Sequence, residues 1–406
     1  MFDVLIVGGG MVGASMAVAL APLGLRVGMI EAFAFENSRS QPSYDDRSVA
    51  LSYGSRLIFQ GMGLWEALAP QSESIAMIHV SDKGHFGATR LYAEKEKVPA
   101  LGYVIESRVL GGVLYSALRE SNVDVIAPAS VHHVEQSPEE GIVKVYADKS
   151  GNSACYECRL LIIADGANSK IRTQVGINVN ERDYQQSALI ANVTTSKPHH
   201  NAAYERFTPS GPLALLPLRD NRYSLVWTHK SCEIDEVLAL DDVAFLKRLQ
   251  ATFGYRQGAF IKAGQRSAYP LKRVKSDTES AGRALVMGNA SHAIHPVAGQ
   301  GLNLAMRDVA VLADLLAKAV NDQGDIGSAD LLAEYEARRR PDHQSVVNYT
   351  DGLVRVFSND FGLLGHLRAG GLLAVDRINP ARQLLARQSM GLRFRQERLS
   401  RGLSLR

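Results

Sequence analysis

A glycine-rich turn near the N-terminus constrains the fold of this chain more than any other feature. Residues 2–7 are mostly apolar and include β-branched side chains, which is typical of a buried parallel strand. Residues 8–13 then have the spacing G-x-G-x-x-G, and residues 11–23 have the composition of a helix that ends at Gly24. A strand, this turn and a helix predict the first βα unit of a Rossmann-type dinucleotide-binding fold.

The glycines of this turn, and an acidic residue after the next strand, each have a mechanical role. Gly8 allows the tight turn, Gly10 allows a pyrophosphate to approach the backbone, and Gly13 lets the helix pack against the strand. The second predicted strand, residues 26–30, ends at Glu31. A carboxylate there accepts hydrogen bonds from a ribose 2′-hydroxyl and repels a 2′-phosphate. The pattern therefore favours FAD or NAD over NADP as the nucleotide bound here.

A second motif lies in the middle of the chain. Residues 160–164 form another apolar run that predicts a buried strand, and Asp165-Gly166 follows it directly. A carboxylate at the carboxyl end of a parallel strand lies where open α/β sheets bind ligands. An Asx turn, with Ser169 as the N-cap of a short helix, explains the same residues equally well. On its own, this motif is compatible with both interpretations.

A third motif runs from Gly288 to Asn303 and continues to Asp308. It places a polar residue, a proline and two glycines before a helix whose apolar side chains recur at helical spacing. Backbone N–H groups at such a helix start can hold a phosphate or an electron-rich ring edge. Because a nucleotide site is already predicted at the N-terminus, two halves of one large cofactor could be bound from opposite ends of the sequence. This arrangement favours a flavin.

Together, the three motifs resemble those of the FAD-dependent aromatic hydroxylases, the single-component flavin monooxygenases related to p-hydroxybenzoate hydroxylase. The resemblance extends from residue 1 to about residue 340. It implies an α/β fold, with a Rossmann-type FAD-binding domain, an interleaved and mostly antiparallel β-sheet substrate domain, and a helical C-terminal tail. The expected boundaries are 1–74, 104–183 and 281–345 for the FAD-binding domain, 75–103 and 184–280 for the substrate domain, and 346–406 for the basic helical region.

The resemblance also implies a set of cofactor-binding residues. Glu31 is expected to hold the adenosine ribose, Arg47 to lie near the flavin and Arg108 near the FAD phosphates. Asn289 is expected near the ribityl chain and pyrophosphate, although the wider family has Asp there; the amide still hydrogen-bonds a hydroxyl but removes a negative charge. The loop 299–303 is expected to contact the isoalloxazine. The full set is Gly8, Gly10, Gly13, Glu31, Arg47, Arg108, Asp165, Gly288, Asn289, Gly299, Gln300, Gly301, Leu302 and Asn303.

Few residues are candidates for a catalytic role. Pro296 matches the family's proline whose backbone lies beside the reacting edge of the flavin, and Tyr269 and His295 are weak candidates for a base, since either could merely cap or pack. The implied chemistry is that of the cofactor: reduced flavin takes O₂ to a C4a-hydroperoxide, which hydroxylates an electron-rich ring. NADPH or NADH is the expected reductant. It would be a transient visitor, which agrees with the absence of a second G-x-G-x-x-G after a strand.

A more specific resemblance is to the ubiquinone-biosynthesis hydroxylases. Residues 295–304 followed by Asp308 resemble their signature, with Ala305 where a glycine is usual. Residues 80–85 and 267–271 resemble the 2-polyprenyl-6-methoxyphenol hydroxylases, the UbiH group. The implied reaction converts a 2-polyprenyl-6-methoxyphenol to the 2-polyprenyl-6-methoxy-1,4-benzoquinol. The alternatives are a sister hydroxylase acting at another ring carbon, or a non-catalytic flavoprotein in an assembly of ubiquinone-biosynthesis proteins.

Composition limits the remaining possibilities. With 406 residues, 46% of them hydrophobic, the chain can bury two cores. Three cysteines favour a reducing compartment, and Cys155 and Cys158, three apart in a predicted strand, would face opposite ways. The histidines are scattered, so no metal site is expected. Because no run of about 18 apolar residues occurs, we expect a cytoplasmic protein, with peripheral association to the inner membrane as a further possibility.

The C-terminal tail is strongly basic. From Phe361 onward, nine arginines and two acids give a net charge of +7, and leucines lie between the arginines. A basic, leucine-rich helix can lie on an anionic membrane surface or dock against a partner protein. An arginine-bearing solvated face over ordinary helix packing explains the composition equally well. Nothing besides charge favours nucleic acid, which is not an expected partner.

Overall fold

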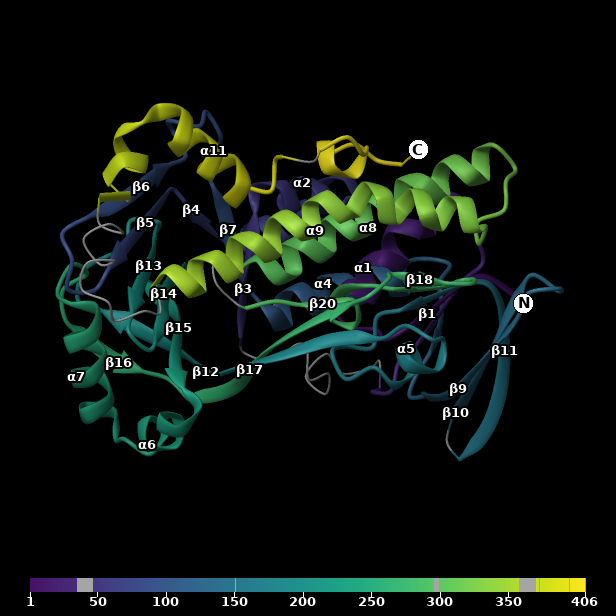
Figure 1. Cartoon of the computed structure of the whole chain (residues 1–406), viewed down its shortest axis with the longest axis horizontal. Coiled ribbons are helices and arrows are strands. Elements are labelled where there is room, and N and C mark those ends of the chain that lie inside the picture. The colour runs from purple at the N-terminus through teal and green to yellow at the C-terminus, as the bar shows by residue number, and fades with distance from the viewer. Residues whose placement is uncertain are drawn as a thin grey trace.

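The computed structural model describes residues 1–34, 47–149, 151–295, 299–357, 370–371, 373–393 and 395–405. Figure 1 shows two β-sheets toward opposite ends of an elongated molecule. The long helices α8 (Gln300–Asn321) and α9 (Ala329–Phe357) pack against each other along one flank. Strands β12 (Val179–Thr195) and β17 (Ser267–Ser276) pair antiparallel and run between the two ends.

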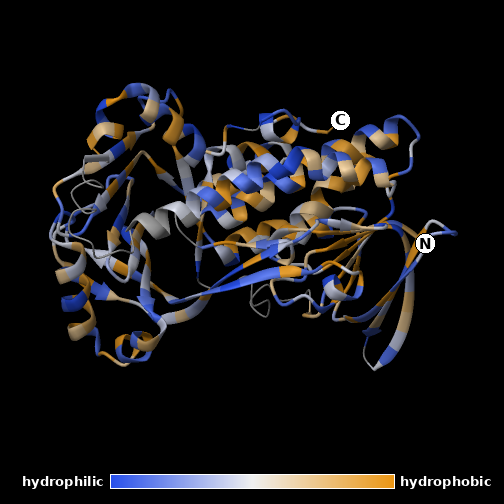
Figure 2. Ribbon diagram, viewed as in Figure 1, coloured by the Kyte–Doolittle hydropathy of each residue, from blue (hydrophilic) through white to orange (hydrophobic). Residues whose placement is uncertain are grey.

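The first sheet contains the predicted Rossmann unit. Its main path has the order β18-β19-β11-β1-β2-β8, and the pairs from β19 to β8 are parallel. Its central strands are almost completely buried, as their apolar runs predict, and Figure 2 shows apolar residues concentrated there. The strands are β1 (Phe2–Val7), β2 (Val27–Ile30), β8 (Asp124–Ile126), β9 (Ser130–Ser137), β10 (Ile142–Lys149), β11 (Asn152–Ile163), β18 (Ser280–Ala281) and β19 (Ala284–Val286).

Helices α1 (Met11–Leu20), α4 (Ser107–Arg119) and α8 pack together over this sheet around one apolar core. The chain continues from α1 through a 3₁₀ turn, η1 (Ala21–Leu23), to Gly24, whose φ of 77° ends the helix. The predicted strand at residues 2–7 and the helical stretch ending at Gly24 are therefore confirmed. The strand predicted at residues 26–30 begins one residue later, and the one at 160–164 is the end of the longer β11.

The second sheet forms the other end of the molecule and has the order β20-β17-β12-β15-β14-β13-β5-β6, with β16 beside β12. The expectation of a mostly antiparallel sheet is confirmed, and the pair β13–β5 is parallel. Helices α6 (Ile234–Leu238) and α7 (Asp242–Phe253) cover one face. Its other strands are β5 (Met77–Asp82), β6 (Ala88–Tyr92), β13 (Ala202–Thr208), β14 (Gly211–Leu218), β15 (Arg222–Lys230), β16 (Phe260–Ala263) and β20 (His292–Ala293).

A small sheet lies between these layers, with β7 (Gly102–Glu106) pairing with both β3 (Ser48–Ser52) and β4 (Glu73–Ile75). Helix α11 (Asn379–Ser389) packs on the second sheet through Ala386. The remaining elements are short: α2 (Tyr53–Gly61), α3 (Trp65–Leu68), η3 (Ala69–Gln71), α5 (Lys170–Gln174), η4 (Ser231–Glu233), η5 (Gly288–Ala290) and η7 (Leu399–Arg401).

The structure also bears on the expected boundary at residue 345 and on the two cysteines of β11. Helix α9 continues through residue 345, where the sequence suggested a domain boundary; the boundaries themselves remain a prediction. Cys155 is exposed and Cys158 buried on β11, and both are free thiols, as their opposite orientations in a strand required. Burial raises the pKa of the Cys158 thiol to about 12. Within the described residues, no helix is both long and apolar enough to cross a membrane.

Candidate functional site

A cavity of about 600 Å³ opens at the carboxyl ends of β1, β2 and β11. This is the edge of a parallel sheet at which open α/β folds bind ligands. Residues from all three sequence motifs line it. Of the expected cofactor-binding residues, those in the lining are Gly8, Gly10, Glu31, Arg47, Asp165, Asn289, Gly301 and Leu302.

The glycine-rich turn has the close packing that its spacing predicts. Gly8 has a φ of 102°, which L-residues with a side chain rarely adopt. A Cβ at Gly13 would lie 1.9 Å from the Gly8 carbonyl oxygen, so the first turn of α1 can approach β1 only without a side chain there. Gly10 precedes α1 as its N-cap residue. Gly13 therefore acts through helix–strand packing rather than by lining the cavity.

Glu31 holds the turn as well as facing the cavity. Its carboxylate accepts the backbone N–H of Gly9 at 2.5 Å and that of Phe33 at 2.9 Å, and the residue is 5% exposed. A carboxylate offers about four acceptor sites, so two backbone bonds leave capacity for ribose hydroxyls. The geometry fits the predicted ribose-binding role of Glu31.

The central motif has both of the features that its sequence suggested. Asp165 lines the cavity, and burial raises the pKa of its carboxyl group. The Ser169 hydroxyl accepts the Arg172 backbone N–H at 3.0 Å and caps α5. The Arg172 guanidinium then donates to the Ala290 carbonyl oxygen at 2.7 Å. The central motif is thereby fastened to the third motif.

The third motif contributes both cavity walls and anchors. Gly301 and Leu302, at the start of α8, line the cavity, and Asn289 lies exposed at its edge. Gly288 and Gly299 lie in the backbone turns before α8, and Gln300 is 3% exposed. These last three residues are not part of the cavity wall.

The Asn303 side chain is directed at protein rather than at the cavity. Its oxygen accepts the Ser52 backbone N–H and the Ser55 hydroxyl, each at 2.7 Å. Its nitrogen donates to the carbonyl oxygens of Ala50 at 2.8 Å and Gly299 at 2.6 Å. These four bonds use the full capacity of a carboxamide. Asn303 therefore fastens α8 to β3 through its side chain, and the expected contact of residues 299–303 with the isoalloxazine stays a prediction.

Arg108 lies outside the lining of the first cavity, and its expected place near the FAD phosphates stays a prediction. Arg108 lies at a second cavity of about 420 Å³, where its guanidinium pairs with Glu106 at 2.6 Å, while the neighbouring Ser107 lines the first cavity. Successive residues at the start of α4 point in different directions, so Ser107 faces the first cavity and Arg108 faces the second. Arg47 and Ile190 line both cavities. Motif spacing gave no signal for Ile190, which comes from the middle of β12.

Tyr269 and His295 have different surroundings. Tyr269 lines the second cavity, with the Arg47 guanidinium 4.7 Å from its ring centre. His295 is 1% exposed, has Nε2 3.2 Å from the Gln186 side-chain oxygen, and packs edge-on against Tyr184. Pro296 lies outside the described residues. These contacts of His295 are those of a packed side chain.

A buried network of charged side chains joins α8, at the end of the third motif, to α9. Asp308 on α8 accepts from Arg339 at 2.5 Å and from His343 at 2.7 Å, both on α9. The other His343 nitrogen lies 2.5 Å from a Glu279 oxygen. Burial opposes the charge on His343, but the two carboxylates outweigh it and raise its pKa to about 9. Burial likewise opposes ionisation of Asp308, yet Arg339 and the histidines hold its pKa well below the usual range.

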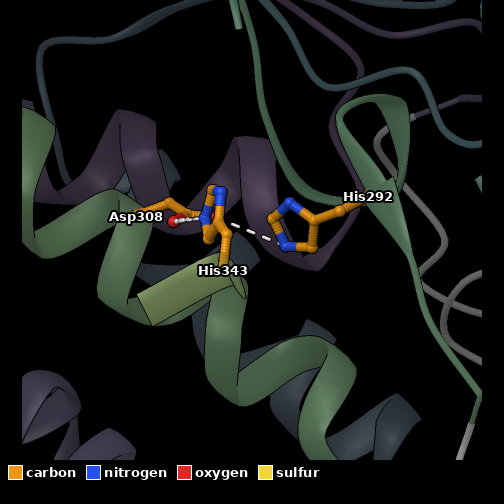
Figure 3. Close-up of side chains that lie close together, drawn as sticks. All are labelled: His292, Asp308 and His343. Carbon is orange, nitrogen blue, oxygen red and sulfur yellow. Dashed lines mark hydrogen bonds and ion pairs between the residues drawn. The ribbon is translucent and has the colours of Figure 1, made fainter. Parts of the chain in front are cut away.

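His292 completes this cluster, as Figure 3 shows, with its Nε2 3.4 Å from Asp308. The ligand atoms of His292, Asp308 and His343 lie within 4.8 Å of one another, a spacing that a metal ion could bridge. A metal fits poorly, because an imidazolium that donates to two carboxylates has no lone pair to give, and Arg339 already neutralises Asp308. We interpret the cluster as ion pairs. His343 has no neighbouring sequence signal that would mark it as a partner of Asp308, because the two residues meet only through tertiary packing.

The larger cavity fits FAD. Its lining runs from Glu31, through the glycine turn, to the N-terminal end of α8 at Gly301 and Leu302. An adenosine can be held at the first end, a pyrophosphate at the turn, and a flavin ring at the helix start. A single cavity thus has an acceptor at Glu31 for the adenosine ribose and backbone groups of Gly10 and Gly301 at the starts of two helices.

Comparisons with known proteins agree with this assignment. The family described as "FAD binding domain" matches residues 1–350. The chain is 37% identical to the "Ubiquinone hydroxylase UbiL" of Rhodospirillum rubrum, covering 99% of this chain and 93% of that protein. It is 32% identical to the "3-demethoxyubiquinol 3-hydroxylase" of Escherichia coli, covering 96% and 98%.

Solved structures share the fold. The p-nitrophenol 4-monooxygenase PnpA of Pseudomonas putida DLL-E4 matches with a TM-score of 0.80 and 17% identity, over 98% of this chain and 99% of that one. The family match and the similarity to the two ubiquinone hydroxylases come from the sequence and do not depend on the fold. Both hydroxylases are similar to this chain along nearly their whole length. The chain belongs to the UbiH/COQ6 family of FAD-dependent hydroxylases of ubiquinone biosynthesis.

Proposed function

We propose that this FAD-dependent monooxygenase converts a 2-polyprenyl-6-methoxyphenol to the corresponding 1,4-benzoquinol, by hydroxylating the carbon para to the phenol oxygen. The observation that supports a substrate of this class is the similarity to ubiquinone hydroxylases over nearly the whole chain. The para position rests on the local sequence likeness to the UbiH group and on chemistry, because a phenol oxygen donates electron density to the para carbon. Bound FAD, once reduced, supplies the activated oxygen from O₂.

The residues of this chain would position the reacting rings and keep water away from them. Ile190 on the second sheet and Val49 on the small sheet form apolar wall of the cavity beside Leu302 at the start of α8. The flavin ring expected at the helix start would lie against this wall, so the substrate ring would meet it in apolar surroundings. Apolar side chains there also limit the access of water, which would otherwise divert activated oxygen to H₂O₂. This arrangement supports ring hydroxylation without a named base.

Hydroxylation at another ring carbon is the second candidate. The Escherichia coli relative is named as a 3-hydroxylase of demethoxyubiquinol, and its similarity covers almost the whole chain. Sister enzymes of one fold can differ only in how they turn the ring against the flavin. The same cavity therefore supports either position.

The experiment that separates the two positions uses purified holoenzyme, NAD(P)H and two short-chain substrates. One is a 2-prenyl-6-methoxyphenol and the other a demethoxyquinol with the same tail. Product structure is determined by mass spectrometry and NMR. A 1,4-benzoquinol from the first substrate supports our proposal. Turnover of the demethoxyquinol alone would replace it with the second candidate.

We also propose that the C-terminal helix contacts an anionic membrane surface, where polyprenyl substrates are found, and that other ubiquinone-biosynthesis proteins meet the enzyme there. On α11, Leu384 is 62% exposed and the preceding Ile378 is 53% exposed. Arg377 and Arg387 are exposed nearby. Exposed apolar side chains with arginines are typical of a helix at a membrane interface.

A further inference from the structure

The chain after α11 lies along helix α2. Figure 1 shows this segment, drawn in yellow, running over α2 toward the C-terminus. We refer to residues 390–393 and 395–405 as the C-terminal strap. The Leu399 side chain is 1% exposed and belongs to the same apolar core as α1, α4 and α8. The strap therefore connects the second sheet, on which α11 packs, to the layer of helices over the first sheet.

Two glycines of α2 allow the strap to lie this close. Gly54 and Gly61 are seven residues apart, which places them on one face of the helix. A Cβ at Gly54 would lie 2.8 Å from the Gly391 carbonyl oxygen, and one at Gly61 would lie 2.8 Å from that of Leu403. Both oxygens are backbone atoms, so neither could move aside without moving the strap. This face of α2 therefore admits the strap backbone only because it has no side chains.

A short series of hydrogen bonds leads from the strap to the FAD cavity. The Gly54 N–H donates to the carbonyl oxygen of Met390, the first strap residue, at 2.8 Å. Two residues earlier, the Ser52 N–H donates to the Asn303 side-chain oxygen at 2.7 Å, and the Asn303 nitrogen donates to the Gly299 carbonyl oxygen at 2.6 Å. Gly299 is the N-cap residue of α8, whose first turn lines the FAD cavity. These bonds connect the end of α11 to the start of α8.

The strap begins where the proposed membrane-contact helix ends. On α11, Ala386 is buried in the cluster that packs on the second sheet, whereas Leu384 is 62% exposed and Arg387 is exposed. Met390 is the C-cap residue of this helix and is 2% exposed in the same cluster. Ala386 and Met390 together fix the rotation of α11. The docked position of the helix therefore determines which of its side chains face outward.

We propose that the C-terminal strap exists in two arrangements, docked on α2 and lifted from it, and that FAD and an anionic membrane surface both bind the docked arrangement more tightly. A ligand shifts such an equilibrium only through different affinities for the two arrangements. FAD meets this condition because the start of α8, which forms part of its cavity wall, is held by the bonds that continue to the strap. The membrane meets it because only docked α11 turns Leu384 outward.

The two ligands therefore strengthen each other's binding without touching. Sites that are coupled through one equilibrium affect each other's affinity by the same factor. Protein that holds FAD is retained at the surface where polyprenyl substrates are found, and protein at that surface retains its FAD. This inference rests on the proposed membrane contact of α11 and does not depend on which ring carbon is hydroxylated.

The test measures FAD affinity in the presence and absence of vesicles. Holoenzyme is diluted serially, and FAD release is followed by flavin fluorescence in buffer, with mixed vesicles of phosphatidylglycerol and phosphatidylcholine, and with vesicles of phosphatidylcholine alone. We expect the mixed vesicles to tighten FAD binding about fivefold and the neutral vesicles to leave it unchanged. In cosedimentation, FAD should tighten binding to the mixed vesicles by the same factor.

Two variants test the route of the coupling. Gly54→Ala should remove the effect of mixed vesicles on FAD affinity, because the new Cβ displaces the strap backbone from α2. Gly112→Ala is the matched control, since its added Cβ meets no atom within 4 Å, and it should keep the wild-type effect. Leu384→Glu should also lose the effect of the vesicles, because α11 then no longer favours the anionic surface.

A second measurement keeps the inference testable should Gly54→Ala fold poorly, and it needs no membrane. Hydrogen exchange is compared between FAD-free and FAD-bound wild type. FAD should slow exchange of the Gly54 amide and of the strap amides about tenfold more than that of the amides of α7.

Each negative result has a distinct meaning. Strap amides that FAD protects no more than α7, or mixed vesicles that bind holoenzyme without changing its FAD affinity, would overturn the coupling and leave the membrane contact in place. Holoenzyme that does not sediment with mixed vesicles would contradict the α11 membrane contact and this inference together.

Discussion

The Asn303 side-chain oxygen accepts the backbone N–H of Ser52 at 2.7 Å, across 251 residues of sequence. This bond joins the start of α8, which forms one end of the FAD cavity, to the end of β3, which forms part of its wall. Asn303 therefore fixes two parts of the cavity wall although it does not line the cavity itself. Gly299 and the first turn of α8 depend on this bond for their position at this end of the cavity.

Asn303→Ala should destabilise the protein and weaken FAD binding together. Four hydrogen bonds are lost and the buried Ser52 N–H is left unpaired, which costs about 3 kcal/mol. Thermal unfolding of FAD-free and FAD-saturated protein measures both effects. Asn303→Asp is the comparison, since it keeps the acceptor and removes the donors. Weaker FAD binding with unchanged stability of the FAD-free protein would instead indicate direct contact with FAD.

Gly13→Ala should prevent the nucleotide turn from forming. The new Cβ would lie 1.9 Å from the Gly8 carbonyl oxygen, a backbone atom that can move only with the turn. We expect protein without bound FAD, measured by absorbance at 450 nm. Gly112→Ala is the matched control, because Gly112 lies in the interior of α4 with no atom within 4 Å of the added Cβ. That variant should keep its FAD and gain about 0.5–1 kcal/mol of stability. A yellow Gly13→Ala protein would contradict the packing argument.

Replacing His343 with Gln should remove a stabilising charge from between α8 and α9. The His343 pKa is raised from 6.5 to about 9, so its contribution is full below pH 6.5 and is lost as pH rises through about 9. At pH 7 we expect a loss of about 3 kcal/mol, measured by denaturant unfolding. The stability of the wild type should fall between pH 6.5 and 9, and that of the variant should fall less. His133→Gln, at an exposed pair with Glu135, should change little.

For His292 we predict the opposite dependence of stability on pH, because its pKa is lowered rather than raised. Burial lowers the pKa of His292 from 6.5 to about 3, so the unfolded chain binds its proton first as pH falls. The stability associated with neutral His292 is full above pH 6.5 and is lost progressively toward pH 3. In His292→Asn, unfolding measured from pH 7 to pH 4 should show a shallower loss than in the wild type. An equally steep loss in the variant would exclude His292 as its source.

Leu384→Glu should weaken association with anionic vesicles. The substitution removes an exposed apolar side chain from α11 and adds a charge that the membrane repels, for which we expect about a tenfold loss in cosedimentation. Val243→Glu on α7 is the matched control, since Val243 is 78% exposed on another face. Deleting the tail would be a poorer test, because Ala386 and Leu399 belong to the buried cores. Equal binding by both variants would argue against an α11 membrane contact.

Local elements were predictable where sequence spacing determines geometry. The strand, turn and helix around Gly8 and Gly13 follow from the apolar run and the glycine positions, and Ser169 caps α5 as its sequence context suggested. Such features depend on neighbours within a few residues. The same reasoning predicted α8 from its apolar helical pattern, but the helix begins at Gln300 and therefore includes Gly301, which was expected to precede it.

The parts that could not be predicted depend on distant residues. His343 meets Asp308 only because α8 and α9 pack against each other, and nothing near either residue in sequence signals the pair. The surroundings of Arg108 depend on the orientation of α4, which turns Ser107 to the FAD cavity and Arg108 to the other one. Arg222 gave no local signal, since its partner Glu106 is 116 residues away.

The measurement that tests the central claim most directly is oxygen incorporation. Purified holoenzyme is supplied with NAD(P)H, ¹⁸O₂ and a short-chain 2-prenyl-6-methoxyphenol, and the products are analysed by mass spectrometry and NMR. We predict one ¹⁸O atom on the ring carbon para to the phenol oxygen, with NAD(P)H consumed in step with product. FAD-containing enzyme that consumes NAD(P)H only to make H₂O₂, with every prenylated phenol or quinol tested, would contradict it.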